Sequence, residues 1–193
     1  MNVLVLRNTF TSVADIIRKH TDNVVENSEL IDLEFLKRNK VEFIVSHGYR
    51  HIIKLPIVNF MRNRIINLHI SLLPWNRGAD PNLWSFLEDT PKGVTIHYLD
   101  EGVDTGDIIT QRKVVFEHDG ETLSTTYQRL QNEIIELFEE VWPQIRKLHY
   151  LGQKQEEIGS FHKLVDKKKY EHLLTEGWNT PVSDLIGKGL KSE

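Results

Sequence analysis

Residues 64–69, with the sequence RIINLH, join a short β-branched run to two polar side chains, Asn67 and His69. The apolar run is typical of a buried strand that delivers Asn67 and His69 at its carboxyl end. Because side chains alternate along a strand, we expect these two on the same face. Ligands of open α/β sheets bind at such strand ends, so this stretch marks a candidate site.

A second strand-like run, residues 94–99 (VTIHYL), leads into the acidic turn 100–107 (DEGVDTGD). Two glycines, Gly102 and Gly106, relax the backbone where a reacting group could approach. The turn also carries Asp104, whose carboxylate could hold a nearby imidazole in place. Taken alone, such a turn could equally be a simple connector.

Chemistry gives Asn67, His69 and Asp104 a joint role. An amide can donate hydrogen bonds to an oxyanion, an imidazole can move a proton near neutral pH, and a carboxylate can stabilise its cationic form. Each residue alone could instead satisfy buried backbone groups. Together they predict transfer of an acyl group to an amine, with a cationic His69, without a metal and without a covalent intermediate.

The amino-terminal third alternates strand and helix patterns, which predicts a parallel sheet with helices on its faces. We expect a Ser12/Asp15 capping pair on the first helix and Leu30, Leu33 and Leu36 buried by the second. The expected elements are a strand at 2–6, a helix at 12–20, a short strand at 24–25, a helix at 28–39 and a central strand at 41–45.

Further along, Asp80 and Pro81 predict a helix start before residues 82–87. Residues 108–116 alternate like a strand. Apolar residues then step by three or four from 121 to 149, which predicts a long scaffold helix that Pro143 should kink or split.

Length and composition limit the remaining possibilities. A chain of 193 residues can bury one good core and a small appendage. The net charge of −4 gives no argument for nucleic-acid binding, and Cys is absent, so disulfides are excluded. No run approaches the length of a membrane span, so a cytoplasmic protein is the default expectation.

Two parts are expected, a catalytic domain at 1–150 and a carboxyl-terminal extension at 151–193. The extension is polar and contains a lysine run at 167–169, yet it carries too many apolar groups for a disordered tail. We expect it to pack on the body or on a partner subunit. Its apolar residues are Phe161, Tyr170, Leu173, Leu174 and Trp178.

The motifs in order resemble the formyltransferases that use 10-formyltetrahydrofolate. The resemblance implies an α/β, Rossmann-like formyltransferase fold, a mostly parallel twisted sheet flanked by helices, here shortened at the N-terminus. It also implies that Asn67, His69 and Asp104 are the catalytic residues. The matching segments are Asn67-x-His69, SLLP at 71–74, Arg77-Gly78, GVT at 93–95 and Asp100-x-Gly102-x-Asp104-x-Gly106.

The same resemblance suggests which residues contact the pteridine of the folate, mainly through backbone groups. These are His47, Gly48, Tyr49, Leu99, Asp100, Gly102 and Val103. The acceptor would lie against the loop that contains Trp75, Asn76, Arg77 and Gly78. Arg77 could pair with a phosphate, or equally with Asp80 or Glu88.

No metal is expected. The spacings of His47, His51 and His97 match no metal-binding signature, so structural or solvated histidines are favoured. The acidic turn lacks the spacing of a calcium-binding EF-hand loop.

The identity of the amine separates the branches of this family. The methionyl-tRNA branch carries a carboxyl-terminal barrel, whereas fewer than fifty residues follow the long helix here. The purine-pathway branch carries a Gly-rich phosphate loop where this chain has RNTFT at 7–11. Residues 159–163 (GSFHK) resemble a segment of formyltransferases that act on amino sugars of sugar nucleotides.

The leading hypothesis is therefore N-formylation of a nucleotide-linked amino sugar, as used in surface polysaccharides. The partner is then a small-molecule amino-sugar nucleotide, with no membrane or nucleic acid, in a possible homodimer. Two alternatives stay open: an enzyme like methionyl-tRNA formyltransferase, and a non-catalytic module that binds folate or a nucleotide sugar. Hydrolysis of formyltetrahydrofolate would use the same site with water as acceptor.

Overall fold

A mixed sheet forms the centre of the computed structural model, which describes residues 1–7, 12–117, 119–147, 150–156 and 158–190. Within these residues, six strands form one sheet in the order β2-β1-β3-β4-β6-β7. The first four are parallel, whereas β6 and β7 run antiparallel to their neighbours. The prediction of a mostly parallel α/β sheet is confirmed. The strands are β1 Asn2–Arg7, β2 Asn23–Asn27, β3 Phe43–His47, β4 Ile65–His69, β6 Gly93–Tyr98 and β7 Ile108–Lys113.

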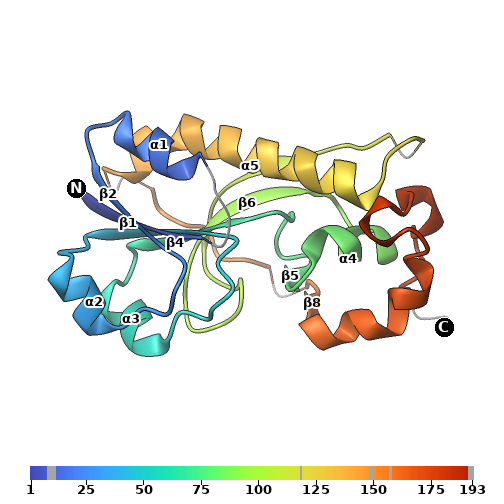
Figure 1. The fold of residues 1–193 in the computed structure, drawn as a ribbon, viewed down its shortest axis with the longest axis horizontal. Coiled ribbons are helices and arrows are strands. Elements are labelled where there is room, and N and C mark those ends of the chain that lie inside the picture. Colours follow the sequence, from blue (N-terminus) through green and yellow to red (C-terminus); the bar gives the residue numbers. More distant parts are fainter. Residues whose placement is uncertain (8–11, 118, 148–149, 157, 191–193) are drawn as a thin grey trace.

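Helices cover both faces of the sheet (Figure 1). One face carries α1 (Val13–Arg18) and the long α5 (Leu123–Ile145), and the other carries α2 (Leu33–Arg38) and α3 (Leu55–Phe60). A further helix, α4 (Pro81–Leu87), lies beyond the sheet beside α5.

Alternation along β1 explains the two apolar cores. Val3 and Val5 join the cluster under α1 and α5, whereas Leu4 and Leu6 join the cluster under α2 and α3. This is the period of two expected when both faces of a strand are buried. The sheet therefore forms a rigid layer whose strand ends can position a site.

Three local predictions in the amino-terminal third are wrong. Ser12 makes no side-chain capping bond, because its backbone is already helical at φ −73° and ψ −4°, and Asp15 pairs with Arg18 at 2.8 Å. The second helix begins only after Asp32, whose carboxylate accepts from the Phe35 amide at 2.7 Å. Leu30 therefore precedes the helix and is 64% exposed. The sequence pattern also did not predict α3.

The long helix α5 begins at a capping box built on Thr122 and Thr125. It continues through Pro143 and ends soon afterwards at Ile145. Residues 148–149 of the predicted helix lie outside the described part. Tyr127, four residues after the buried Leu123, is 45% exposed and lines a cavity.

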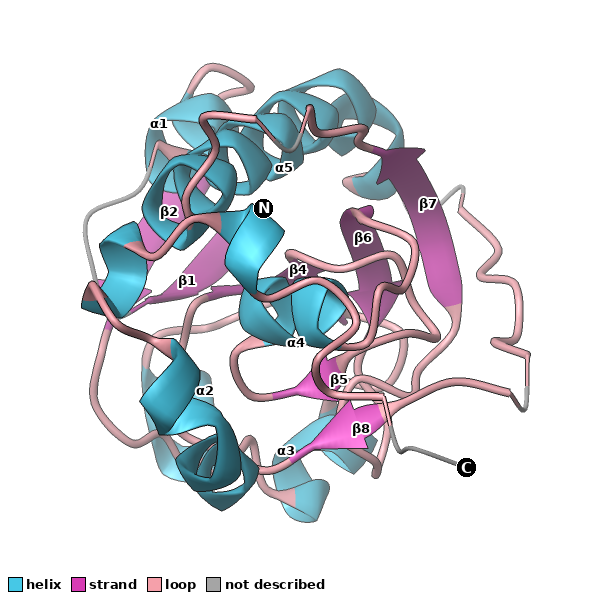
Figure 2. Cartoon of the chain, turned by 90° about the vertical axis from the view of Figure 1, so that its right-hand side faces the viewer, coloured by secondary structure: helices cyan, strands magenta, loops and turns pink. Residues whose placement is uncertain are grey.

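The chain returns to the body after α5. β8 (Phe161–His162) pairs in parallel with β5 (Arg77–Gly78), away from the main sheet (Figure 2). The 3-10 helices that follow are η1 Leu164–Leu173, η2 Gly177–Asn179 and η3 Val182–Asp184. Val182 and Leu185 are fully buried in the core under α5. Segments far apart in sequence thus meet at the loop that follows β4.

None of the helices in the described residues is both long and apolar enough to span a membrane.

Candidate active site

Asn67 and His69 lie at the carboxyl end of β4, as the strand pattern predicts. Ile65, which shares their face, belongs to the core under α2 and α3, so this face changes from apolar to polar along the strand. β4 is paired on both sides, by β3 and by β6. The two side chains are therefore held by a strand in the interior of the sheet.

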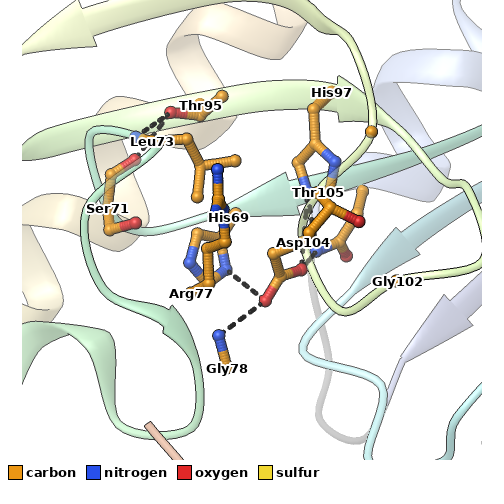
Figure 3. Close-up of polar contacts among 12 residues, drawn as sticks. His69, Ser71, Leu73, Arg77, Gly78, Thr95, His97, Gly102, Asp104 and Thr105 are labelled. Carbon is orange, nitrogen blue, oxygen red and sulfur yellow. Dashed lines mark hydrogen bonds and ion pairs between the residues drawn. The ribbon is translucent and has the colours of Figure 1, made fainter. Parts of the chain in front are cut away.

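Asp104 connects the residues of the site (Figure 3). Its Oδ2 accepts a hydrogen bond from the Gly78 amide at 2.9 Å and lies 3.7 Å from His69 Nδ1. Its Oδ1 accepts from Asn67 Nδ2 at 3.2 Å. The structure thus brings the three predicted catalytic residues together around one carboxylate.

The second nitrogen of His69 fixes the tautomer. His69 Nε2 lies 3.1 Å from the carbonyl oxygen of Asn76, which can only accept, so Nε2 carries a proton. A neutral His69 then presents the Nδ1 lone pair toward Asp104, and only the cation donates there. Nδ1 is therefore the atom that can receive a proton.

Burial sets the resting charges of this pair. Burial lowers the pKa of His69 below its usual range, although the charge of Asp104 acts to raise it. For Asp104, burial acts to raise the pKa, but His69, His97 and the Gly78 amide outweigh it and lower the pKa well below its usual range. The resting site therefore contains a neutral imidazole beside a carboxylate. The cationic His69 expected from the sequence is therefore not the resting form.

His97 is a site residue that sequence reasoning missed. It was treated as structural or solvated, yet it is fully buried with Nε2 3.5 Å from Asp104 Oδ1 and 3.4 Å from Asn67 Nδ2. Its Nδ1 lies 2.8 Å from the Tyr98 carbonyl. The antiparallel register places His97 opposite Asn67, and only that register could have revealed it.

The loop after β4 is held by a buried threonine. Thr95 Oγ1 donates to the Ser71 carbonyl at 2.7 Å and accepts from the Leu73 amide at 3.1 Å. Gln111 Nε2 donates to both Thr95 Oγ1, at 2.9 Å, and the Leu73 carbonyl, at 2.8 Å. These bonds fix the chain that leads from His69 to Asn76.

A cavity of about 880 Å³ opens on Asn67, His69 and Asp104. Its size lies in the upper range of small-molecule sites. It is lined by the three predicted catalytic residues, by Gly78, and by all the residues predicted to contact folate. The latter are His47, Gly48, Tyr49, Leu99, Asp100, Gly102 and Val103.

The other predicted acceptor residues, Trp75, Asn76 and Arg77, are not among those lining this cavity. The Asn76 side chain is fully buried and donates to Thr90 Oγ1 at 2.8 Å. The Arg77 guanidinium donates to Gln155 Oε1 at 2.9 and 2.7 Å, rather than to Asp80 or Glu88. Their contact with an acceptor stays a prediction.

The far end of the cavity is built by the segment after α5. Phe161, His162, Lys163 and Leu164 line it together with the half-exposed Trp178. His162 stacks on Trp84 with ring centroids 3.8 Å apart. The sequence predicted that this extension would pack on the body or on a partner, but not that it would line the site.

Among the described residues, no group of three or more His, Cys, Asp or Glu side chains could hold a metal ion. Residues 8–11, where a phosphate loop was sought in the sequence, lie outside the described residues. The described groups suit stabilisation of an oxyanion and movement of a proton during acyl transfer.

Known proteins with a similar sequence and fold are formyltransferases. The chain is 51% identical to a formyltransferase, PseJ, from Anoxybacillus kamchatkensis, with a TM-score of 0.94 over 98% of this chain and 100% of the other. That crystal structure is a complex with UDP-4,6-dideoxy-4-formamido-L-AltNAc and tetrahydrofolate. A 4-N formyltransferase from Francisella tularensis has the same fold, with 24% identity and a TM-score of 0.77 over 87% of this chain and 78% of the other.

Curated relatives are more distant. A methionyl-tRNA formyltransferase from Caldanaerobacter subterraneus subsp. tengcongensis is 29% identical over 88% of this chain, which spans about half (54%) of that relative. A phosphoribosylglycinamide formyltransferase from Bacillus subtilis is 36% identical over 63% of each chain. The profile of the family described as formyl transferase matches residues 7–141. The chain therefore belongs to the formyl transferase family, as its motifs predicted.

Proposed function

We propose that this protein transfers a formyl group from 10-formyltetrahydrofolate to the amine of a nucleotide-linked amino sugar. The observation that carries this proposal is the 51% identity to the Anoxybacillus formyltransferase over nearly the whole of both chains. That enzyme was crystallised with a 4-formamido UDP-sugar and tetrahydrofolate, which are the two products of such a transfer. We therefore infer that the acceptor here is the C4 amine of a UDP-linked dideoxy amino sugar.

One end of the cavity suits the folate. The carboxylate of Asp100 accepts from the Gly102 amide at 2.9 Å and from Thr105 Oγ1 at 2.6 Å, so it is used within its own turn. Tyr49 is oriented by a 2.6 Å bond from its hydroxyl to the Glu29 carbonyl. These contacts support folate recognition through backbone groups of residues 47–49 and 99–103.

The opposite end suits the nucleotide. Trp178 is 45% exposed and offers a ring face on which a base could stack. Lys163 lines the same end, where a diphosphate needs a cation. Lys167 lies 5.6 Å from the Trp178 ring and 2.8 Å from Asp80, so its charge is already partly balanced. In this proposal Gly78, which lines the cavity between the two ends, borders the sugar.

The proposed reaction uses the resting charges described above. The sugar amine attacks the formyl carbon, and the new C–N bond leaves a negative oxygen near Asn67 Nδ2. The attached nitrogen gives its extra proton to His69 Nδ1, and the resulting cation is stabilised by Asp104 and by the Asn76 carbonyl. The bond to N10 of the folate then breaks, and the departing nitrogen takes up the proton. The formamido sugar nucleotide and tetrahydrofolate are the only products.

Direct assay tests this function. Purified protein is incubated with 10-formyltetrahydrofolate and a panel of UDP- and dTDP-linked amino sugars, and each acceptor is followed by mass spectrometry. We expect one formyl group on a UDP-linked 4-amino sugar and none with His69→Ala. Formylation of methionyl-tRNA alone would support the tRNA alternative, and ligand binding without any transfer would support a binding module.

A lysine variant tests the nucleotide end of the cavity. Lys163→Ala should raise the KM for the UDP-sugar about 10- to 100-fold, because a charge-assisted contact to phosphate contributes roughly 1.5–3 kcal/mol. The matched control is Lys168→Ala, which removes an exposed lysine that is not among the residues lining the cavity. Equal KM values for the two variants would contradict this placement. The KM for the folate should not change in either.

Homodimer formation is also a proposal. The segment after α5 leaves Leu164, Val165 and Leu190 at least 59% exposed, and burial of these side chains against a second copy would support the proposal. Light scattering after gel filtration would measure the mass of the particle. A monomer at micromolar concentration would rule out a stable dimer.

A further inference from the structure

Gln155 joins the two loops that build the catalytic site. Its Nε2 donates to the carbonyl oxygens of Asp104 and Gly106, both at 2.8 Å. Its Oε1 accepts from Arg77 Nε and Nη2 at 2.9 and 2.7 Å. A glutamine amide has two donor hydrogens and one acceptor oxygen, so all of its polar groups are used.

The residues that Gln155 holds need support. Asp104 has a φ of 54°, a left-handed conformation that a residue with a Cβ adopts at a cost. The Asp104 carboxylate in turn accepts from the amide of Gly78, the residue after Arg77. Gln155 and Asp104 thus form a closed set of contacts between the acidic turn and the loop after β4.

The segment that carries Gln155 is itself fixed on both sides. Gln153 pairs with Ile108 through two backbone hydrogen bonds of 2.7 and 2.8 Å. Ser160 accepts from the Arg77 amide at 3.0 Å and donates its own amide to the Pro74 carbonyl at 3.2 Å. Gln155 therefore lies between two backbone contacts to the body of the protein.

We propose that Gln155 is a positioning residue for formyl transfer, which holds Asp104 beside His69, with Oδ2 3.7 Å from Nδ1, and so makes the segment after α5 part of the catalytic machinery. The activity measurement rests on the proposed function, whereas the measurement on His69 itself does not. Gln155 acts through Asp104 and is not among the residues lining the cavity.

The first variant is Gln155→Met, which keeps the side-chain length and removes all four hydrogen bonds. We expect kcat to fall about 100-fold, since a misplacement near 1 Å of a catalytic group has that effect, while the KM for each substrate changes little. The matched control is Gln153→Met, an exposed glutamine whose pairing with Ile108 uses only its backbone. Equal kcat values for the two variants would overturn the proposal.

A second variant separates the two halves of the contact. Gln155→Glu keeps an acceptor for Arg77 but places a carboxylate oxygen against the carbonyls of Asp104 and Gly106. If the acidic turn is what Gln155 holds, this variant is as slow as Gln155→Met. A wild-type kcat for Gln155→Glu would overturn the proposal, because anchoring Arg77 would then be sufficient.

The imidazole of His69 provides a readout that a purely structural role would not change. Asp104 and His97 are the titratable groups that face it, and Asp104 raises its pKa. When Asp104 moves away in Gln155→Met, the His69 pKa measured by NMR titration should fall below the wild-type value. An unchanged His69 pKa would overturn the role of Gln155, whether or not the wild type formylates a sugar. If the wild type formylates no sugar, that result alone refutes only the proposed function.

Discussion

The predicted catalytic trio, Asn67, His69 and Asp104, is held in two different ways. Asn67 and His69 lie on β4, which is paired with a strand on each side. Asp104 lies in a turn with a positive φ and is held by hydrogen bonds from Gly78 and Gln155. A strand places side chains by the geometry of the sheet, whereas a turn depends on contacts from distant segments. Damage to the sheet should therefore affect stability, and damage to the turn should affect turnover.

The largest loss of turnover is expected for a substitution in β4. His69→Ala should lower kcat by roughly 10³-fold, because it removes the group that moves the proton. The fold should remain, since the backbone of β4 keeps its pairing. Formyl transfer measured alongside the melting temperature checks both statements. Retained turnover in a folded variant would refute the role of His69.

A change in the turn should come next. In Gly106→Ala the added Cβ would lie 1.9 Å from the Tyr98 carbonyl oxygen, so the turn has to shift. Displacement of Asp104 should lower kcat about 100-fold. The protein should still unfold cooperatively, as circular dichroism can show. Loss of folding rather than of turnover would mean that the turn supports the sheet, contrary to the distinction drawn here.

The pH profile refines the comparison. Protonation of His69 removes the base, so kcat should fall as the pH falls. Burial lowers the His69 pKa, so its contribution appears below the usual histidine range, near pH 6.5. Asp104→Asn removes a group that raises this pKa, so the acid limb should move to still lower pH. Because the acceptor amine is the same for both enzymes, the difference between their profiles reports His69. A shift to higher pH would contradict this arrangement.

The smallest effect on turnover is expected in the sheet core. Ile44 in β3 is fully buried, and Ile44→Val removes one methylene group. The free energy of unfolding should decrease by about 0.5–1.5 kcal/mol, with kcat unchanged. Urea unfolding and steady-state kinetics would measure the two quantities. A marked loss of turnover would show that the sheet and the turn are not separable.

The same difference explains what could be predicted from sequence. Asn67 and His69 follow from the alternation of one strand, and Asp104 follows from the acidic turn after a second strand; the resemblance of ordered motifs then supported all three. The strands at 2–6 and 94–99 were found because short-range periodicity is enough to identify a buried strand.

The missed features depend on contacts between distant residues. His97 reaches the site only through the register between β4 and β6. Gln155 lies in a polar segment with no periodic signal, and its role depends on a return of the chain. Leu30 matched a helical pattern, yet the capping bond of Asp32 starts the helix later. Local pattern does not contain such information.

The pairing of β8 with β5 has a consequence for biosynthesis. Residues 161–162 complete the two-stranded sheet beside the loop after β4, and Val182 and Leu185 fill the core still later in the chain. A ribosome that has released only the first 150 residues has exposed the whole trio without the segment that fixes Asp104 or lines the far end of the cavity. Translation products that stop before residue 185 should therefore be inactive, so the proposed formyl transfer begins only after this segment has been made.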